Sequence, residues 1–174
     1  MLDVVVALPE DREAACRFYA EVCAFQARQV YGPRWQYGVY PADADLDRRI
    51  AAGELLLGFL GGRVAAAMVM ARGEDPIYRD VPWGFAAAED QVCVLHLLAV
   101  HPDFRGRHLA ETMLDELIRR GRAEGLAAVH LDVILGNPPA EQLYRKKGFR
   151  FAAEKAVWYP DTGDVVVRLY EYPL

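Results

Sequence analysis

The apolar residues of this chain follow two periodicities, one typical of helices and one of buried strands. Ala15, Phe18 and Val22 recur at helical spacing, which predicts an amphipathic helix over Asp11–Phe25. By contrast, Gln91–Val100 is almost continuously apolar, as in a strand buried on both faces. The other expected elements are strands at Leu2–Leu8, Glu54–Leu60, Arg63–Arg72, Ala128–Ile134, Phe149–Val157 and Val165–Tyr172, and helices at Ala44–Ala52, from Leu109 to near Gly125, and from Asn137 to Gly148.

Turn residues indicate how these elements connect. Gly61-Gly62 between two apolar runs predicts a hairpin, and Pro160–Gly163 predicts a second one near the end of the sequence. Between the hairpins, a strand, a helix and a strand form a crossover unit whose two strands should run parallel. Gly73–Asp90 contains two prolines and scattered aromatic residues and is expected to be a long loop. The length of 174 residues predicts one α+β domain spanning residues 1–174.

Composition and charge narrow the class of protein. The formal net charge of -5 argues against a dedicated nucleic-acid binder, because phosphate contacts need concentrated Lys and Arg. The three cysteines, at positions 16, 23 and 93, have no paired spacing, so neither a disulfide framework nor a metal site is indicated. No signal peptide and no apolar run of membrane-spanning length is evident. We therefore expect a soluble cytoplasmic protein with no membrane or nucleic-acid partner.

The segment Arg105–Ala110 joins the apolar strand to the next helix and is the first candidate for ligand chemistry. The start of a helix leaves N–H groups unpaired and carries partial positive charge, so it attracts anions. Arg105 and Arg107 add cationic donors, and Gly106 allows close approach of the backbone. The segment could therefore hold a pyrophosphate, although a solvated turn with surface arginines is an alternative. The phosphate loops of P-loop kinases and nicotinamide-dependent dehydrogenases are absent.

Two segments together resemble the GCN5-related N-acetyltransferases (GNAT). Leu98-Ala99-Val100-His101-Pro102-Asp103-Phe104-Arg105-Gly106 is similar to the fourth strand and pyrophosphate loop of that family, whose loop pattern is Q/R-x-x-G-x-G/A. Arg105 and Ala110 match the first and last positions of the pattern, whereas His108 stands where glycine is usual. Asn137–Phe149 resembles the segment N-x-x-A-x-x-L-Y-x-K-x-G-F at every marked position. The two segments cover about a third of the chain.

This resemblance implies the GNAT fold and a coenzyme. The fold has a central mixed, mostly antiparallel twisted sheet of about seven strands, with flanking helices and a parallel pair that splays apart at the cofactor cleft. The implied cofactor is acetyl-coenzyme A, whose pantetheine would pair with the backbone of Leu98 and Val100. The full set of implied cofactor-binding residues is Leu98, Ala99, Val100, Arg105, Gly106, Arg107, His108, Leu109, Ala110, Asn137 and Tyr144.

Two side chains are candidates for proton transfer. The resemblance implies that Tyr144 protonates the sulfur of the coenzyme, although a tyrosine packed beside Phe149 would fit the sequence too. His96 is two residues before Leu98, which places both on one face of a regular strand, and a histidine can pass a proton through a water. Its surroundings resemble the corresponding strand of arylalkylamine N-acetyltransferases, where a histidine transfers a proton; a hydrogen-bonded core histidine is the alternative. Cys93 is interpreted as a small core residue.

The function that follows is transfer of an acetyl group from acetyl-coenzyme A to a primary amine by direct attack. The amine could belong to a small molecule or to a protein. Aromatic residues in irregular segments are candidates for the acceptor site, namely Trp35, Tyr37, Tyr40 and Trp83. A non-catalytic acyl-coenzyme A sensor of the same fold is the alternative, because His108 departs from the loop pattern. The second hairpin could also expose a strand edge for a homodimer.

Overall fold

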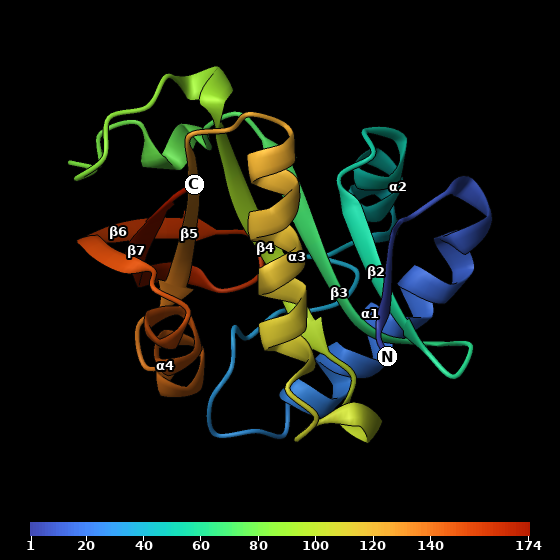
Figure 1. The fold of residues 1–174 in the computed structure, drawn as a ribbon. Coiled ribbons are helices and arrows are strands. Elements are labelled where there is room, and N and C mark those ends of the chain that lie inside the picture. Colours follow the sequence, from blue (N-terminus) through green and yellow to red (C-terminus); the bar gives the residue numbers. More distant parts are fainter.

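A seven-stranded sheet runs through the protein, and the computed structural model describes it over residues 1–174 (Figure 1). The strand order is β1-β2-β3-β4-β5-β7-β6, and only β4 and β5 are parallel. This arrangement confirms the expected mixed, mostly antiparallel sheet with one parallel pair. The strands are β1 (Asp3–Val6), β2 (Leu55–Leu60), β3 (Arg63–Arg72), β4 (Val92–Val100), β5 (Ala128–Ile134), β6 (Arg150–Tyr159) and β7 (Gly163–Pro173).

Four α-helices cover the two faces of the sheet. They are α1 (Arg12–Gln26), α2 (Asp43–Ala51), α3 (Leu109–Ala123) and α4 (Pro138–Lys146). Side chains of α1 and α2, such as Phe18 and Leu46, belong to the core on one face. Side chains of α3 and α4, such as Met113 and Tyr144, belong to the core on the other face (Figure 1). None of the helices has the length and apolarity that crossing a membrane requires.

A β-bulge interrupts β4 at its centre. Ala67 of β3 pairs with Ala99, and Val69 pairs with His96, so Leu97 and Leu98 together lie opposite a single residue of β3. Leu97 adopts a left-handed conformation with φ of 56°, which is uncommon for a non-glycine residue. The Leu97 carbonyl accepts a 3.0 Å hydrogen bond from the buried Tyr19 hydroxyl of α1. Helix α1 therefore supports the bulge directly.

The bulge changes which side chains share a face of β4. Before it, Val94 lies in the core under α1 and α2, and Leu95 lies in the core under α3 and α4. After it, Leu97 joins the first core and Leu98 packs against the second. The expectation that His96 and Leu98 share a strand face is therefore wrong, because one extra residue reverses the alternation between them.

The parallel strands β4 and β5 separate soon after they begin. Their paired residues are Val92–Val94 with Ala128–His130, and no pairing continues beyond His130. Strand β5 remains paired with β7 along its whole length, up to Ile134 with Val167. The second half of β4 is paired with β3 but has no partner on its other edge. The sheet thus contains an opening between two of its central strands, as the resemblance implies.

The long loop between β3 and β4 is held against the sheet by polar and aromatic contacts. Trp83 stacks on the ring of His130, with ring centroids 3.6 Å apart, and His130 Nδ1 lies 2.7 Å from Glu74 Oε2. The buried Glu171 carboxylate accepts 3.0 Å hydrogen bonds from the N–H groups of Gly84 and Phe85. The segment predicted as a loop is therefore held against β5 and β7 by contacts of Glu74 and of Trp83–Phe85.

Candidate active site

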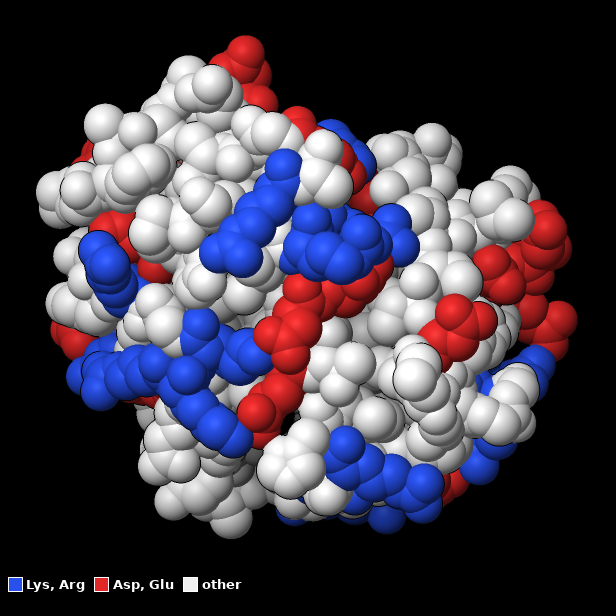
Figure 2. All heavy atoms as spheres, viewed as in Figure 1, with Lys and Arg blue, Asp and Glu red and all other residues white.

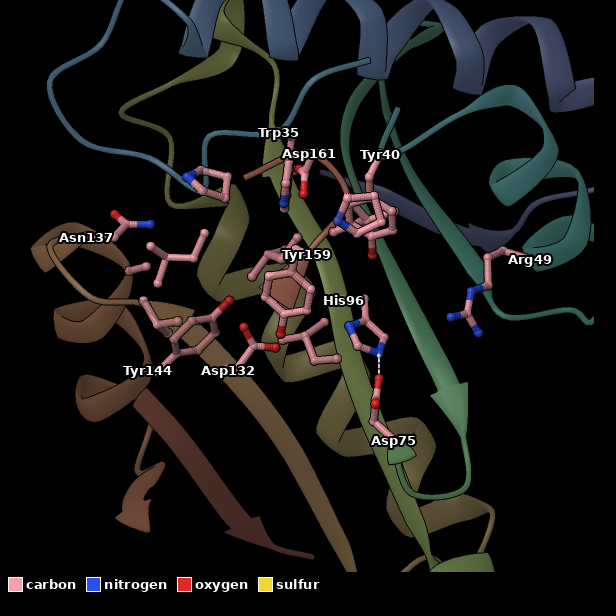
Figure 3. A pocket seen from close by; sticks show the side chains of 18 residues that line it. Trp35, Tyr40, Arg49, Asp75, His96, Asp132, Asn137, Tyr144, Tyr159 and Asp161 are labelled. Atoms are coloured by element: carbon pink, nitrogen blue, oxygen red, sulfur yellow. Dashed lines mark ion pairs between the residues drawn. The ribbon is translucent and has the colours of Figure 1, made fainter. Parts of the chain in front are cut away.

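A cavity of about 290 Å³ lies where β4 and β5 diverge (Figure 3). Strand β4 contributes His96 and Leu98, β5 contributes Asp132, and α4 contributes Tyr144. The remaining walls come from loops, from α2 and from the end of β6. The complete lining is Pro33, Trp35, Tyr40, Arg49, Asp75, Leu95, His96, Leu97, Leu98, Asp132, Val133, Ile134, Asn137, Ala140, Tyr144, Tyr159, Pro160 and Asp161. Both side chains predicted for proton transfer therefore face one cavity.

The predicted acceptor-site aromatic residues divide into two groups. Trp35 and Tyr40 line the cavity (Figure 3). Tyr37 lies outside the lining, where its hydroxyl donates a hydrogen bond to Asp43. Trp83 is also outside, because it stacks on His130 and packs against Tyr78. The structure therefore does not gather the four aromatic residues at one pocket, since two of them serve local packing instead.

His96 is held next to carboxylates in the interior of the cavity. Its side chain is 16% exposed, and its Nε2 lies 3.6 Å from Asp75 Oδ2. Burial lowers the pKa of His96 below its usual value, although the nearby carboxylates of Asp132 and Asp75 oppose this shift. The ring is therefore neutral near pH 7, which is the state that can accept a proton.

Asp132 connects several groups of the site. It lies between Tyr144 and His96 in Figure 3, and its charge affects the pKa of both. Its carboxylate accepts a hydrogen bond from the buried Tyr78 hydroxyl. Burial raises the pKa of Asp132, while the bond from Tyr78 and the neighbouring His96 oppose that rise. Asp132 therefore faces the cavity and is also fixed by a hydrogen bond.

Tyr144 extends from the second turn of α4 towards the cavity. Helix α4 begins with Pro138 after Asn137, as the sequence predicts, but the Asn137 side chain makes no capping hydrogen bond and lines the cavity instead. Tyr144 also packs edge-on against Phe149, so packing and cavity-facing roles coexist. Burial, and then the charge of Asp132, raises the pKa of Tyr144. Its hydroxyl therefore stays protonated at neutral pH and can donate a proton or hydrogen bond.

The cysteines lie outside the lining of this cavity. Cys93 is fully buried and is not part of the lining. Burial is the main reason that its pKa rises to about 12, so its thiol remains protonated. No group of three or more His, Cys, Asp or Glu side chains has the geometry to hold a metal ion. The titratable side chains that line the cavity include His96, Asp132 and the hydroxyls of Tyr40, Tyr144 and Tyr159.

The turn from Arg105 to Ala110 leads from β4 into α3 at one end of the opening. Gly106 has φ of 75°, and no atom lies within 4 Å of the position that a Cβ would occupy there. His108 is in the left-handed region, with φ of 57°, immediately before α3, which explains why glycine suits this position. Its side chain is 78% exposed and bonds Glu111 at 2.9 Å. The histidine therefore leaves the inner side of the turn free.

Basic side chains surround this turn. Arg105 lies over the ring of Phe25, and Arg107 and Arg63 lie over the ring of Phe104. In Figure 2, Lys and Arg gather at the lower end of the face shown, near the turn before α3, and an acidic strip follows α3 itself. The arginines have exposed positions at the turn. The local charge therefore suits an anion even though the whole chain is acidic.

These features fit acetyl-coenzyme A. The free edge of β4 offers backbone groups to an extended amide chain, as a neighbouring strand would. The first turn of α3 offers N–H groups without intrahelical acceptors, including those of Leu109 and Ala110. The open space beside Gly106 permits close approach of a phosphate. Donor and acceptor would then meet at the cavity that contains His96 and Tyr144.

Several residues of the cavity carry no signal in the sequence. Asp75 comes from the long loop, Tyr159 and Asp161 come from the second hairpin, and Arg49 comes from α2. All four lie outside the recognisable motifs, and only the sheet order brings them to the cavity. The Pro160–Gly163 turn signal locates Asp161 in the chain, but it gives no indication that the carboxylate faces the site.

Comparison with known proteins assigns the class. The sequence model described as "Acetyltransferase (GNAT) family" matches residues 26–149, which is more than half of the chain. The protein therefore belongs to the GNAT acetyltransferases, a family of acyl-coenzyme A-dependent enzymes. A curated relative from Bacillus subtilis (strain 168), provisionally named a [ribosomal protein bS18]-alanine N-acetyltransferase, is 28% identical over 67 residues. That match spans 38% of this chain and 44% of the relative, so less than half of the relative is matched.

Solved structures share the whole fold. An acetyltransferase of the GNAT family from Listeria monocytogenes superposes with a TM-score of 0.79 at 22% identity, over 99% of this chain and 95% of the other. The ribosomal-protein-S18-alanine N-acetyltransferase from Escherichia coli gives a TM-score of 0.64 at 20% identity, over 99% and 94% of the two chains. At these identities the likeness establishes the fold, while the acceptor must be inferred from the cavity.

Proposed function

We propose that this protein transfers the acetyl group of acetyl-coenzyme A to a primary amine, with Tyr144 as general acid and His96 as general base. The observation that carries the proposal is the cavity at the opening between β4 and β5, because His96 and Tyr144 both line it. When bound, acetyl-coenzyme A supplies the acetyl group as a thioester, so transfer forms a nitrogen–carbon bond and breaks a carbon–sulfur bond. The amine nitrogen attacks directly, without an enzyme nucleophile.

Binding of the donor is assigned to the strand and the turn. The backbone of Leu98–Val100 would hold the pantetheine along the free edge of β4. The N–H groups from Gly106 to Ala110 would hold the pyrophosphate, with Arg105 and Arg107 adding positive charge. Asn137, which faces the cavity and makes no capping bond, is available for a polar contact near the acetyl end.

His96 removes the first of the two protons that the acceptor nitrogen must lose. An alkyl ammonium has a pKa near that of lysine, about 10.4, so few molecules are free base at pH 7. The lowered pKa of His96 keeps its ring neutral, and the carboxylates of Asp75 and Asp132 stabilise the imidazolium that forms when the ring accepts the proton. The proton passes from the ammonium to His96 directly or through one water.

Tyr144 provides the proton that the leaving sulfur needs. Its hydroxyl remains protonated because burial and the charge of Asp132 raise its pKa. Only burial and the charge of Asp132 affect the pKa of this hydroxyl, and no protein group hydrogen-bonds to it. It is therefore free to donate into the cavity. The charge of Asp132, which adds to the effect of burial on the pKa of Tyr144, also attracts the cationic form of the acceptor.

Calorimetry with acetyl-coenzyme A and a thiol-release assay test the proposal. The acceptor panel should contain small amines and a peptide with an N-terminal alanine, because relatives are named for that activity. Tyr144→Phe should lower kcat by about 10²- to 10⁴-fold while donor affinity stays within about twofold of the wild type, since only one hydroxyl is lost. Tyr31→Phe, the same change at an exposed tyrosine, is the matched control.

The outcomes separate catalysis from sensing. Donor binding without thiol release for any amine would contradict the proposal and favour a non-catalytic acyl-coenzyme A sensor. Absence of donor binding at millimolar concentration would contradict both. The exposed side chain of His108, which bonds Glu111 rather than a group of the turn, supports the catalytic interpretation over the sensor.

A further inference from the structure

The charges that line the cavity are mostly of one sign. Asp75, Asp132 and Asp161 come from three separate segments and all face the cavity (Figure 3). Arg49 is the one cationic residue with a fixed charge in the lining, and its Nη1 already pairs with Glu54 Oε2 at 2.6 Å. His96 is neutral near pH 7 for the reason given above. The cavity therefore has an excess of negative charge that the protein does not balance.

The carboxylates divide between two parts of the cavity. Asp75 and Asp132 lie beside His96, where the transfer is proposed to occur. Asp161 lies in the turn between β6 and β7, near Trp35 in Figure 3. Tyr40 lies within the electrostatic influence of both Asp132 and Asp161. The acidic groups thus face the cavity both at the reaction centre and away from it.

Asp161 has no counter-ion although it is almost fully buried. The residue is 8% exposed, and neither ion pair at the cavity, His96 with Asp75 or Arg49 with Glu54, includes it. Its only stabilising neighbours are backbone groups of the turn and of Gln36, and burial raises its pKa above the usual value. A buried carboxylate without a cation is unfavourable. A cation from a ligand would provide the missing partner.

Aromatic side chains complete this second part of the cavity. Trp35 and Tyr40 line it together with Asp161. The faces of such rings attract ammonium groups, most strongly where water is excluded. A carboxylate beside aromatic rings is therefore suited to an alkylammonium ion, and it disfavours a neutral or anionic group. The cavity volume of about 290 Å³ is near the lower limit for small-molecule sites, so the acceptor is small.

From this arrangement we propose that the acceptor is a short aliphatic diamine or polyamine, one amine of which reacts beside His96 while a second ammonium binds Asp161, Trp35 and Tyr40. This proposal rests on the acetyl-transfer function above and names its substrate class. The reacting ammonium first loses one proton to His96, and its nitrogen then forms the bond to the acetyl carbon as the carbon–sulfur bond breaks. The sulfur leaves as a thiol with the proton of Tyr144, and the second proton that the nitrogen must lose to become an amide restores the Tyr144 hydroxyl. The second ammonium keeps its proton throughout, so it serves as a positioning group.

The test compares acceptors of equal length that differ at the far end. The thiol-release assay would use 1,4-diaminobutane against butylamine and 4-aminobutanol, and then diamines of three to six carbons in the same way. The diamine should exceed its monoamine in kcat/KM by about 10- to 100-fold, the range expected for a hydrogen bond to a charged group. This comparison is made on the wild-type protein, so it does not depend on the folding of a variant.

A substitution at Asp161 then locates the effect. Asp161→Asn keeps the shape and the turn-forming ability of the side chain but removes its charge, so the ratio of kcat/KM for diamine over monoamine should fall towards one. Asp164→Asn, the same change at an exposed position three residues later, should leave the ratio unchanged. Two further measurements check the assignment. Acetylation should occur on only one amine of the diamine, and in Asp161→Asn the KM for the diamine should rise by a larger factor than kcat falls.

Three results would overturn the proposal. Equal kcat/KM for diamines and monoamines would contradict it while leaving the acetyl-transfer function intact. An unchanged ratio in Asp161→Asn would show that the second ammonium binds elsewhere. Faster acetylation of a peptide with an N-terminal alanine than of any diamine would assign the cavity to a protein acceptor. Failure of every amine and peptide to release thiol would instead contradict the acetyl-transfer function itself.

Discussion

The hydrogen bond from Tyr19 to Leu97 offers a direct test of what stabilises the β4 bulge. Tyr19→Phe removes the hydroxyl that donates to the Leu97 carbonyl at 3.0 Å, and it keeps the ring, so no cavity of side-chain size forms. Tyr19 is fully buried and Leu97 is 5% exposed, so water cannot readily replace the lost donor. An unsatisfied buried acceptor costs about 1–3 kcal/mol, and we expect this loss in the free energy of unfolding.

Urea unfolding followed by circular dichroism measures this loss. The midpoint should decrease while the m-value stays constant, because the surface exposed on unfolding is the same. Tyr31→Phe removes a hydroxyl from an exposed tyrosine and should change the stability by no more than about 0.5 kcal/mol. A Tyr19→Phe protein as stable as the wild type would refute the role of α1 in supporting the bulge. A weaker affinity for acetyl-coenzyme A should accompany the lost stability, since the bulge forms one edge of the donor site.

Three other predictions follow from the site and the loops around it. Because burial lowers the pKa of His96, the acid limb of the kcat profile should lie below pH 6.5 and should disappear in His96→Gln; a limb above that value would contradict a neutral base. His108→Val should be less stable than His108→Gly by about 1–2 kcal/mol in urea unfolding, because a branched side chain disfavours the left-handed conformation. Glu171→Gln loses one of two charge-assisted bonds to the loop, about 1.5–3 kcal/mol, so amide exchange at Gly84 and Phe85 should accelerate without a matching loss of global stability.

The elements of this fold were largely predictable because each has a local signal. Helical spacing predicted Asp11–Phe25, and the structure has the helix at Arg12–Gln26. Glycine pairs and proline–glycine turns marked both hairpins. The Asn137–Phe149 pattern resembled the family, and that resemblance implied a mixed, mostly antiparallel sheet of about seven strands with an opening between its parallel pair. These features depend on neighbouring residues or on a specific motif, so they can be predicted from a single sequence.

The bulge and most of the acidic cavity were not predictable for a physical reason. An almost uniformly apolar strand has no alternation that an inserted residue could interrupt, so nothing in Gln91–Val100 indicates that Leu97 and Leu98 oppose one residue. Asp75 and Asp161 resemble ordinary turn residues, because their signal is the local preference for Asp near proline and glycine. Trp83 was assigned to the cavity by its loop, but stacking on His130 places it elsewhere.

Strand β6 is the outermost strand at its end of the sheet, and the same hairpin delivers Tyr159 and Asp161 to the cavity. Phe151 and Trp158 of this strand are both more than half exposed. A second chain that added a strand along β6 would therefore bury these rings and stiffen the segment that holds the second ammonium. Self-association and acceptor selectivity would then depend on one another, so the selectivity of the protein should be compared at several protein concentrations.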